Sequence, residues 1–298
     1  MIIKNIAYTA LATLQLTAIS QAEEVTKSDS NADDKKHVTI IVGTHHYSPQ
    51  RSMPELKKEL ERLGFEVALI NPDWNPEKDK RGLPGLEVLE KTDLTVFFTR
   101  WLKLEGQQYD QMMGYVKAGK PVVGLRTANH GFNYPKDNPK SELNVGFGKD
   151  VLGTPYLIHL KGSTKINITE GQENHPILTG VSGTWSSPGT LYLSDIQEGV
   201  QPILQGTGNS KRVGKVENMY GTHELQSTMT DNIAWTWTNK HGGKTFYTSL
   251  GHEADFGNPK SMRVMVNGIH WAAGADIPSA DTEIKIFSTK SKKKKATK

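Results

Sequence analysis

Short apolar runs alternate with segments of helical periodicity in the first half of the chain. Four runs have the length and apolar character of strands buried on both faces: His37–Gly43, Phe65–Ile70, Leu94–Phe98 and Pro121–Leu125. Two segments with apolar residues every three or four positions, each followed by a Gly, predict helices: Met53–Leu63 and Gln107–Ala118. This order of strands and helices predicts an α/β fold with a doubly wound, mostly parallel sheet.

The second half is less regular, and it predicts an antiparallel extension of the same sheet. Three short runs have strand character: Tyr156–Leu160, Thr164–Ile168 and Gln201–Gln205. Two late strands and a closing helix are expected at Ala234–Trp237, Lys244–Ser249 and Ser261–Ala273. Between them, the polar segment 133–148 has the length of a lid or binding loop. The Gly- and Lys-rich segment 206–215 lacks the spacing of a phosphate loop, so we expect a hairpin or flexible turn.

The two ends differ in composition from the body of the chain. Residues 1–22 combine a basic residue, an apolar core too short to span a membrane, and a small-x-small cleavage site, which is typical of a secretory signal peptide. We therefore expect a periplasmic or secreted protein with no transmembrane segment. Residues 23–36 are polar and predict a disordered linker, residues 37–275 a folded body, and residues 276–298 a Lys-rich disordered tail.

Charge and cysteine content narrow the chemistry. The formal net charge of the 298 residues is +4, but the last 18 residues hold seven Lys against Asp281 and Glu283. The basic character is therefore a property of the tail, and nothing else in the chain favours nucleic-acid binding. The chain has no Cys, which excludes thiol catalysis, disulfides and Cys-ligated zinc.

Polar side chains follow four of the predicted strands, where each strand ends. The carboxyl ends of parallel strands share one edge of a sheet, and ligands bind there. We therefore expect one cavity, with His130, His252 and Glu253 as candidate acid–base catalysts. The candidate substrate-binding residues are His45, His46, Tyr47, Arg100, Trp101, Arg126 and Asn129. Arg suits carboxylate or phosphate groups, and His suits proton transfer near neutral pH.

Each of these residues has a structural alternative. A single loop His usually serves as a hydrogen-bonding residue, and an Arg after a strand can pair with a buried carboxylate. His45 and His46 are adjacent, so at most one is expected to face the cavity. Phe132 is expected in the core rather than on a sugar ring. Five further histidines lack this position after a strand, and we do not expect them in the site: His37, His159, His223, His241 and His270. No cofactor is evident, although His and Glu could hold a divalent metal such as zinc.

With these residues in view, the chain resembles the ThuA-like (trehalose utilisation) family of the class I glutamine amidotransferase-like superfamily. The matching segments are Phe97–Arg100, Gly119–His130, Asn174–Ile177, Phe246–His252 and Asn267–Gly274. The resemblance covers about residues 37–274 and implies a flavodoxin-like fold. Glutamine amidotransferases place a Cys nucleophile where Arg126 stands here. Arg is no nucleophile, so glutamine hydrolysis through a thioester is excluded.

The resemblance implies a role in carbohydrate metabolism, with a keto-sugar derivative as the small-molecule ligand and a sugar oxidoreductase as the pathway partner. One hypothesis is an enzyme, a carbohydrate-active hydrolase or isomerase, in which His130 or His252 transfers protons. The other is a non-catalytic carbohydrate-binding or sensing protein of the same fold. No carboxylate pair of the kind used by most glycosidases is evident, since Glu253 has no visible partner.

Overall fold

The structure is a computed structural model that describes residues 35–287. The expected signal peptide, residues 23–34 of the expected linker, and residues 288–298 of the expected tail lie outside the described residues. Within residues 35–287, no helix combines the length and the apolar character needed to cross a membrane.

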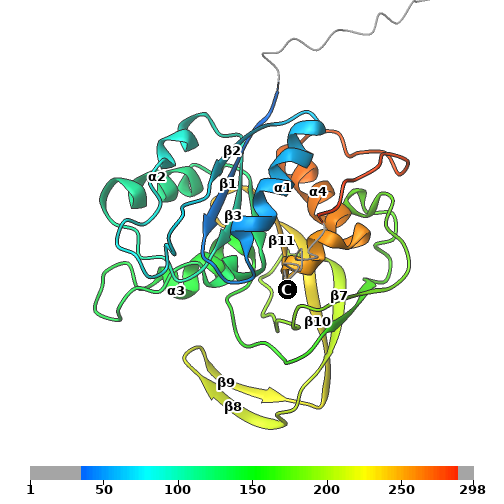
Figure 1. Cartoon of the computed structure of the whole chain (residues 1–298). Coiled ribbons are helices and arrows are strands. Elements are labelled where there is room, and N and C mark those ends of the chain that lie inside the picture. Colours follow the sequence, from blue (N-terminus) through cyan, green and yellow to red (C-terminus); the bar gives the residue numbers. More distant parts are fainter. Residues whose placement is uncertain (1–34, 288–298) are drawn as a thin grey trace, which may run out of the picture. The chain divides into compact units, whose positions relative to one another are not determined.

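A nine-stranded sheet organises the described chain, in the order β2-β1-β3-β4-β11-β10-β7-β5-β6. Its first five strands are parallel: β1 (His37–Gly43), β2 (Glu66–Ile70), β3 (Leu94–Thr99), β4 (Val122–Leu125) and β11 (Lys244–Thr248). With β11 counted as the fifth strand, this is the 2-1-3-4-5 order of flavodoxin-like folds. The structure confirms the doubly wound parallel sheet (Figure 1).

The antiparallel extension is also confirmed, with changes in its members. It consists of β5 (Thr164–Ile168), β6 (Trp185–Ser187), β7 (Gln201–Asn209) and β10 (Thr228–Thr238). Segment 156–160 was expected to be a strand, but only His159 forms an isolated bridge, to Tyr192. The expected late strand at 234–237 is part of the longer β10, and β7 continues into the segment expected as a turn.

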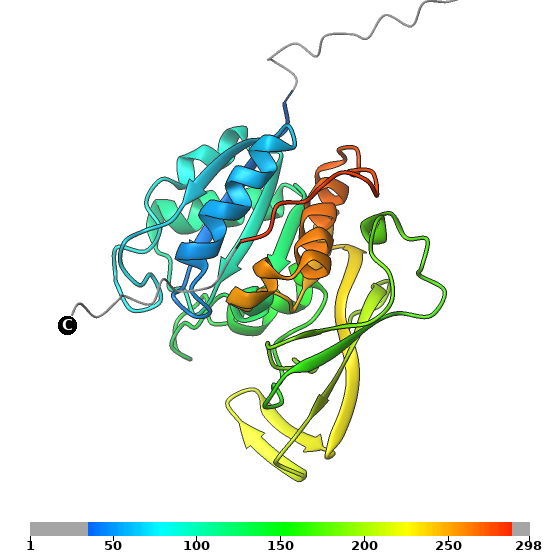
Figure 2. The same cartoon turned by 45° about the vertical axis from the view of Figure 1, so that its right-hand side comes forward.

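The hairpin of β8 (Gly214–Asn218) and β9 (Gly221–Leu225) follows β7 and pairs only with itself among the described strands. It is drawn in yellow beside the ends of β7 and β10 (Figures 1 and 2). Segment 206–215, expected as a hairpin or turn, thus contains the end of β7 and the start of this hairpin.

Helices cover both faces of the parallel strands. The helices are α1 (Pro49–Arg62), α2 (Gly106–Lys117), α3 (Leu143–Gly146) and α4 (Pro259–Ala273). One core packs α1 and α4 against residues such as Ile40 and Phe98, and a second core packs α2 against Ile41 and Phe97. Neighbouring strand residues thus contribute to opposite cores, because side chains alternate between the two faces of a strand.

The close packing of α4 on β11 depends on Gly268. A Cβ built at this position would lie 2.1 Å from the Phe246 ring, so only a residue without a side chain fits. The expected polar loop 133–148 contains α3 and the start of a π-helical turn, Phe147–Val151.

The first part of the expected tail contacts the body. The backbone N–H of Lys285 donates to Glu59 of α1 (2.8 Å), and the N–H of Phe287 donates to the carbonyl of Phe256 (2.8 Å). The Arg263 guanidinium of α4 donates to the carbonyls of Ser279, Ala280 and Thr282. These contacts hold residues 276–287 against α1 and α4, so this part of the expected disordered tail is ordered in the structure.

Candidate functional site

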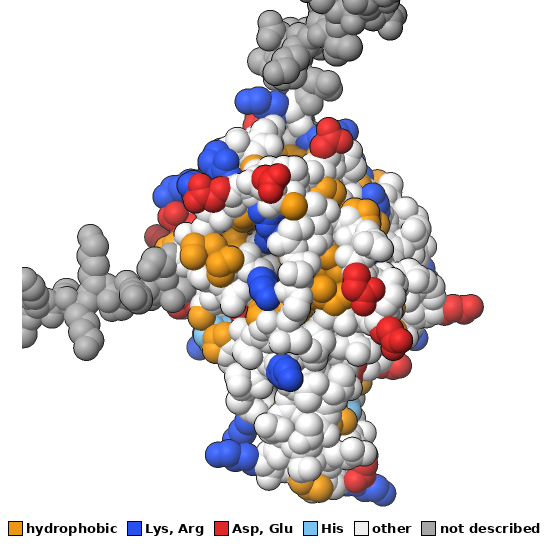
Figure 3. Space-filling view, turned by 90° about the vertical axis from the view of Figure 1, so that its right-hand side faces the viewer, with side chains coloured by type: hydrophobic (Ala, Val, Ile, Leu, Met, Phe, Trp, Pro, Cys, Tyr) orange, Lys and Arg blue, Asp and Glu red, His pale blue; other side chains and the backbone are white. Residues whose placement is uncertain are grey.

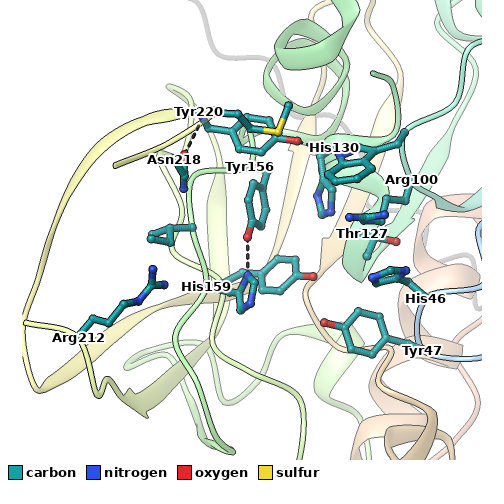
Figure 4. Close-up of a pocket in the computed structure, with 14 residues that line it drawn as sticks. His46, Tyr47, Arg100, Thr127, His130, Tyr156, His159, Arg212, Asn218 and Tyr220 are labelled. Carbon is teal, nitrogen blue, oxygen red and sulfur yellow. Dashed lines mark hydrogen bonds between the residues drawn. The ribbon is translucent and has the colours of Figure 1, made fainter. Parts of the chain in front are cut away.

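A cavity of about 390 Å³ opens where the parallel strands β1, β3 and β4 end (Figure 4). Six of its lining residues follow these strands within five positions: His46, Tyr47, Arg100, Trp101, Thr127 and His130. This is the edge at which flavodoxin-like folds bind their ligands. The structure therefore places five of the sequence-predicted site residues around one cavity.

The backbone is strained at the same edge. Four non-Gly residues in the described chain have positive φ, and all of them follow the ends of β1, β3 or β4: Tyr47 (65°), Ser48 (55°), Trp101 (56°) and Arg126 (46°). A left-handed conformation costs a non-Gly residue about 1–2 kcal/mol. Such strain gathers at functional sites, where the surrounding structure holds it in place.

Arg126 is the first residue of the 3₁₀ turn Arg126–His130, which directly follows β4, but its side chain does not line the cavity. The guanidinium is fully buried and donates to the carbonyl of Ser249 (2.6 Å) and to Thr190 Oγ1 (3.2 Å). It also donates to Tyr47 Oη (3.3 Å) and lies over the rings of Tyr47 and Tyr192. Arg126, expected to bind substrate, is therefore not among the lining residues, and its hydrogen bonds connect the segments at Tyr47, Thr190 and Ser249.

His130 lines the cavity and is 5 % exposed. Its Nδ1 lies 2.8 Å from the side-chain oxygen of Asn129. An amide oxygen only accepts hydrogen bonds, so Nδ1 carries the proton and Nε2 keeps its lone pair. Burial lowers the pKa of His130 well below its ordinary value, and the positive charge of Arg100 adds to the effect. His130 is therefore neutral at pH 7 and able to accept a proton.

Arg100 is oriented by a carboxylate behind it. Its Nη1 forms an ion pair with Glu77 (2.7 Å), whose side chain is 4 % exposed, and its guanidinium stacks on Trp101 (3.4 Å to the ring centre). His46 Nδ1 lies 3.7 Å from the other oxygen of Glu77. Partial burial and the charge of Arg100 lower the pKa of His46. Glu77, on the long loop after β2, therefore neutralises much of the charge of Arg100. This is the structural alternative stated for an Arg after a strand, a pairing with a buried carboxylate.

Tyr47 and Tyr192 both have their rings against the Arg126 guanidinium. Burial acts to raise the pKa of Tyr47, but the charge of Arg126 and the hydrogen bonds to its hydroxyl outweigh burial and lower the pKa. Burial raises the pKa of Tyr192 well above its ordinary value. The charge of Arg126 thus lowers the pKa of Tyr47, whereas burial dominates at Tyr192.

The far wall comes from segments that sequence reasoning did not assign to the site. Tyr156, Ile158, His159 and Tyr192 line it, and the Tyr156 hydroxyl is hydrogen-bonded to His159 Nδ1 (2.5 Å). The exclusion of His159 from the site was therefore wrong. The residue sits on a loop rather than after a core strand, and no motif marks it.

The β8–β9 region completes the rim with Arg212, Asn218, Met219 and Tyr220. The Trp101 indole N–H donates to Tyr220 Oη (3.1 Å), and the Asn218 amide donates to the carbonyl of Leu157 (2.9 Å). These two bonds fix the hairpin at the cavity. Segment 133–148, expected as a lid or binding loop, contributes no lining residue.

Five expected residues lie outside the cavity lining: Arg126, Asn129 and the three described next. His252 caps the 3₁₀ turn Glu253–Gly257: its Nδ1 accepts from the N–H of Ala254 (3.2 Å), and its ring contacts Tyr47. Glu253 forms an ion pair with Arg51 of α1 (2.8 Å). His45 is not among the lining residues, whereas the adjacent His46 is, as expected for neighbouring side chains that point to opposite sides. Phe132 is buried in the core, as expected.

The described residues contain no group of three or more His, Asp or Glu side chains placed to hold a metal ion. The candidate site residues His45, His46, His130 and His252 are thus not gathered into such a group in residues 35–287.

Comparison with solved structures finds proteins of similar fold. A ThuA-like protein from Parabacteroides merdae shares 16 % identity, with 83 % of this chain and 96 % of that chain covered and a TM-score of 0.51. Two further structures are less similar. The N-terminal domain of mmIFT52 shares 10 % identity, with 82 % of this chain and 100 % of that chain covered and a TM-score of 0.45. The glutaminase domain of Trypanosoma brucei CTPS shares 8 % identity, with 85 % and 100 % covered and a TM-score of 0.41. No curated protein matches the chain.

The first of these similarities supports the fold alone, since identity is low. The family model described as trehalose utilisation matches residues 37–272, which is most of the chain. The cavity described above lies wholly within this range. The chain therefore belongs to the ThuA (trehalose utilisation) family.

Proposed function

We propose that this cavity binds a carbohydrate or a keto-sugar derivative and that His130 acts on it as a general base. The observation that carries the proposal is the cavity itself. Its volume falls within the range of small-molecule pockets, about 300–1,000 Å³. It presents a buried neutral His among the aromatic rings of five residues: Tyr47, Trp101, Tyr156, Tyr192 and Tyr220.

One hydroxyl in the wall has no hydrogen-bond partner in the described protein. Thr127 is 1 % exposed and lines the cavity, yet its Oγ1 has no hydrogen-bond partner among the described residues. A buried hydroxyl without a partner costs about 1–3 kcal/mol. The Oγ1 atom is itself enclosed, so a ligand hydroxyl could pair with it only after a rotation of the Thr127 side chain toward the cavity.

The lining favours one reaction class. No Asp or Glu lies among the residues described as lining the cavity, so the carboxylate pair of most glycosidases is not assembled there. Proton transfer needs only one base and one acid. His130 Nε2 would accept a proton from a carbon or hydroxyl next to the keto group, and the Tyr47 hydroxyl would supply one to the carbonyl oxygen. This chemistry is an isomerisation or elimination at a keto-sugar rather than a hydrolysis.

The test combines binding and turnover. A thermal-shift screen of the mature chain against trehalose, hexoses, sugar acids and keto-sugars should identify a ligand that raises the melting temperature. With that ligand, His130→Gln should retain affinity within a few fold and lose turnover. His175→Gln, a half-buried His in the turn before Leu178, is the matched control and should retain both.

Three outcomes separate the alternatives. Loss of turnover with retained affinity in His130→Gln supports the enzyme. Binding without turnover in the wild-type chain supports the non-catalytic carbohydrate-binding protein. A screen in which no carbohydrate raises the melting temperature contradicts both. Export through the N-terminal signal and a sugar oxidoreductase as pathway partner are further parts of the proposal.

A further inference from the structure

The charged groups around the cavity are all of one sign. The charged residues in its described lining are Arg100 and Arg212, with no carboxylate. Three His also line it, His46, His130 and His159, and each has a lowered pKa, so the positive charge comes from the two Arg. The outer surface differs, since acidic and basic side chains are interspersed on the face shown in Figure 3. The one-sided charge therefore belongs to the cavity.

The two Arg differ in how they are compensated. Arg100 forms an ion pair with Glu77, so much of its charge is neutralised. Arg212 has no carboxylate within ion-pair distance in residues 35–287, and its guanidinium makes no hydrogen bond to a described residue. Its side chain reaches from the turn before β8 toward His159 (Figure 4).

The backbone of Arg212 is nonetheless held in place. Ser210 Oγ donates to the carbonyl of Arg212 (2.7 Å) and accepts from its N–H (3.1 Å). The turn thus presents an uncompensated guanidinium at the cavity rim.

His159 provides a second polar group on the same side. Its Nδ1 is bonded to Tyr156, which leaves Nε2 for a ligand. Burial lowers the pKa of His159, and the charges of Arg126 and Arg212 act in the same direction. The neutral His159 ring and the Arg212 guanidinium can therefore both hydrogen-bond to the same group of a ligand.

A neutral sugar would not need this arrangement. Its hydroxyl groups donate hydrogen bonds as readily as they accept them, and Asp or Glu would be the strongest acceptors for them. This cavity offers charged donors and no charged acceptor. Guanidinium groups, in contrast, match the oxygens of carboxylate and phosphate in geometry and charge.

We infer that the ligand of this cavity is a polyhydroxylated anion whose carboxylate or phosphate binds Arg212 at the rim beside His159, while its sugar ring lies among the tyrosines. This inference rests on the proposed function, because it names the class of carbohydrate that the same cavity takes.

Three probes with the same ring test it by calorimetric titration at pH 7.5: glucose, glucuronate and glucose 6-phosphate. At least one of the two anions should bind about tenfold or more tightly than glucose, which corresponds to about 1.4 kcal/mol or more. Whichever anion binds better identifies carboxylate or phosphate as the preferred group. Added salt should reduce the difference, because Arg212 is exposed to solvent.

Arg212→Gln should weaken binding of the preferred anion about tenfold and change glucose binding much less, so that the preference is lost, with the melting temperature of the ligand-free protein unchanged. Lys215→Gln, an exposed basic residue of β8 that does not line the cavity, is the matched control and should keep the preference. The inference is overturned if glucose binds as tightly as both anions, or if Arg212→Gln retains the preference. Glucose binding alone would leave the proposed function standing. Failure of all three probes and of the wider carbohydrate screen would overturn both.

Discussion

Replacement of Arg126 by Met should destabilise the protein and alter Tyr47, without removing a direct ligand contact. The guanidinium is fully buried, and its bonds join three segments: the end of β11 at Ser249, the loop at Thr190, and the turn at Tyr47. Met has a similar length but no donor, so the carbonyl of Ser249 would lose its charged partner.

The magnitude follows from these contacts. The bond to Ser249 is short and charge-assisted, and a bond of this kind contributes about 1.5–3 kcal/mol. The contacts with the rings of Tyr47 and Tyr192 add about 0.5–1 kcal/mol each. Relief from burying a cation offsets part of this total. We expect a net loss of about 3 kcal/mol in the free energy of unfolding, or about 6–12 °C in melting temperature.

Two assays test this prediction. Urea denaturation measures the free energy of unfolding, and the absorbance of tyrosinate during a pH titration reports the pKa of Tyr47. Because Arg126 lowers the pKa of Tyr47, its removal should raise that pKa. Arg263→Met is the matched control: this Arg also donates to backbone carbonyls, but at residues 279–282, and its loss should lower stability without moving the Tyr47 titration. The reasoning is refuted if Arg126→Met keeps wild-type stability while ligand affinity falls tenfold, since Arg126 would then contact the ligand directly.

Two further predictions concern packing and pH. Gly268→Ala places a methyl group against the Phe246 ring and should lower the free energy of unfolding, measured by urea denaturation, by about 1–3 kcal/mol. Gly114→Ala in α2 is the control: a Cβ there meets open space, so this free energy should rise by about 0.5–1 kcal/mol. Equal effects of the two substitutions would contradict the packing of α4 on β11. His130 has a lowered pKa, so the unfolded chain binds more protons below an ordinary His pKa of about 6.5, and stability should fall as pH drops below that value. NMR should show a neutral His130 ring at pH 6 with the proton on Nδ1; a ring protonated at that pH, or a proton on Nε2, would contradict the proposed base.

The parallel sheet was predictable because its strands are buried on both faces. Runs such as Leu94–Phe98 and Pro121–Leu125 consist almost entirely of apolar residues, and their ends locate the site edge by topology alone. His46, Arg100 and His130, which follow strand ends in the sequence, line the cavity at this edge.

The remaining wall could not be predicted in this way. His159 and Tyr192 lie on irregular segments whose position depends on long-range packing, and Arg212 is brought to the rim by a hairpin with no apolar pattern. The direction of the Arg126 side chain could not be predicted for a related reason. Its place after β4 was predicted correctly, but its side-chain direction depends on Thr190 and Ser249, which are distant in sequence.

The central claim is that the cavity at the ends of β1, β3 and β4 is the carbohydrate site. The most direct test is an NMR titration of the His ring nitrogens with the carbohydrate that raises the melting temperature. The ring signals of His130 and His159 should shift in proportion to occupancy, while those of His175 and His270, which lie outside the cavity lining, should stay constant. Saturable binding that moves His175 or His270 and leaves His130 and His159 unchanged would contradict the account.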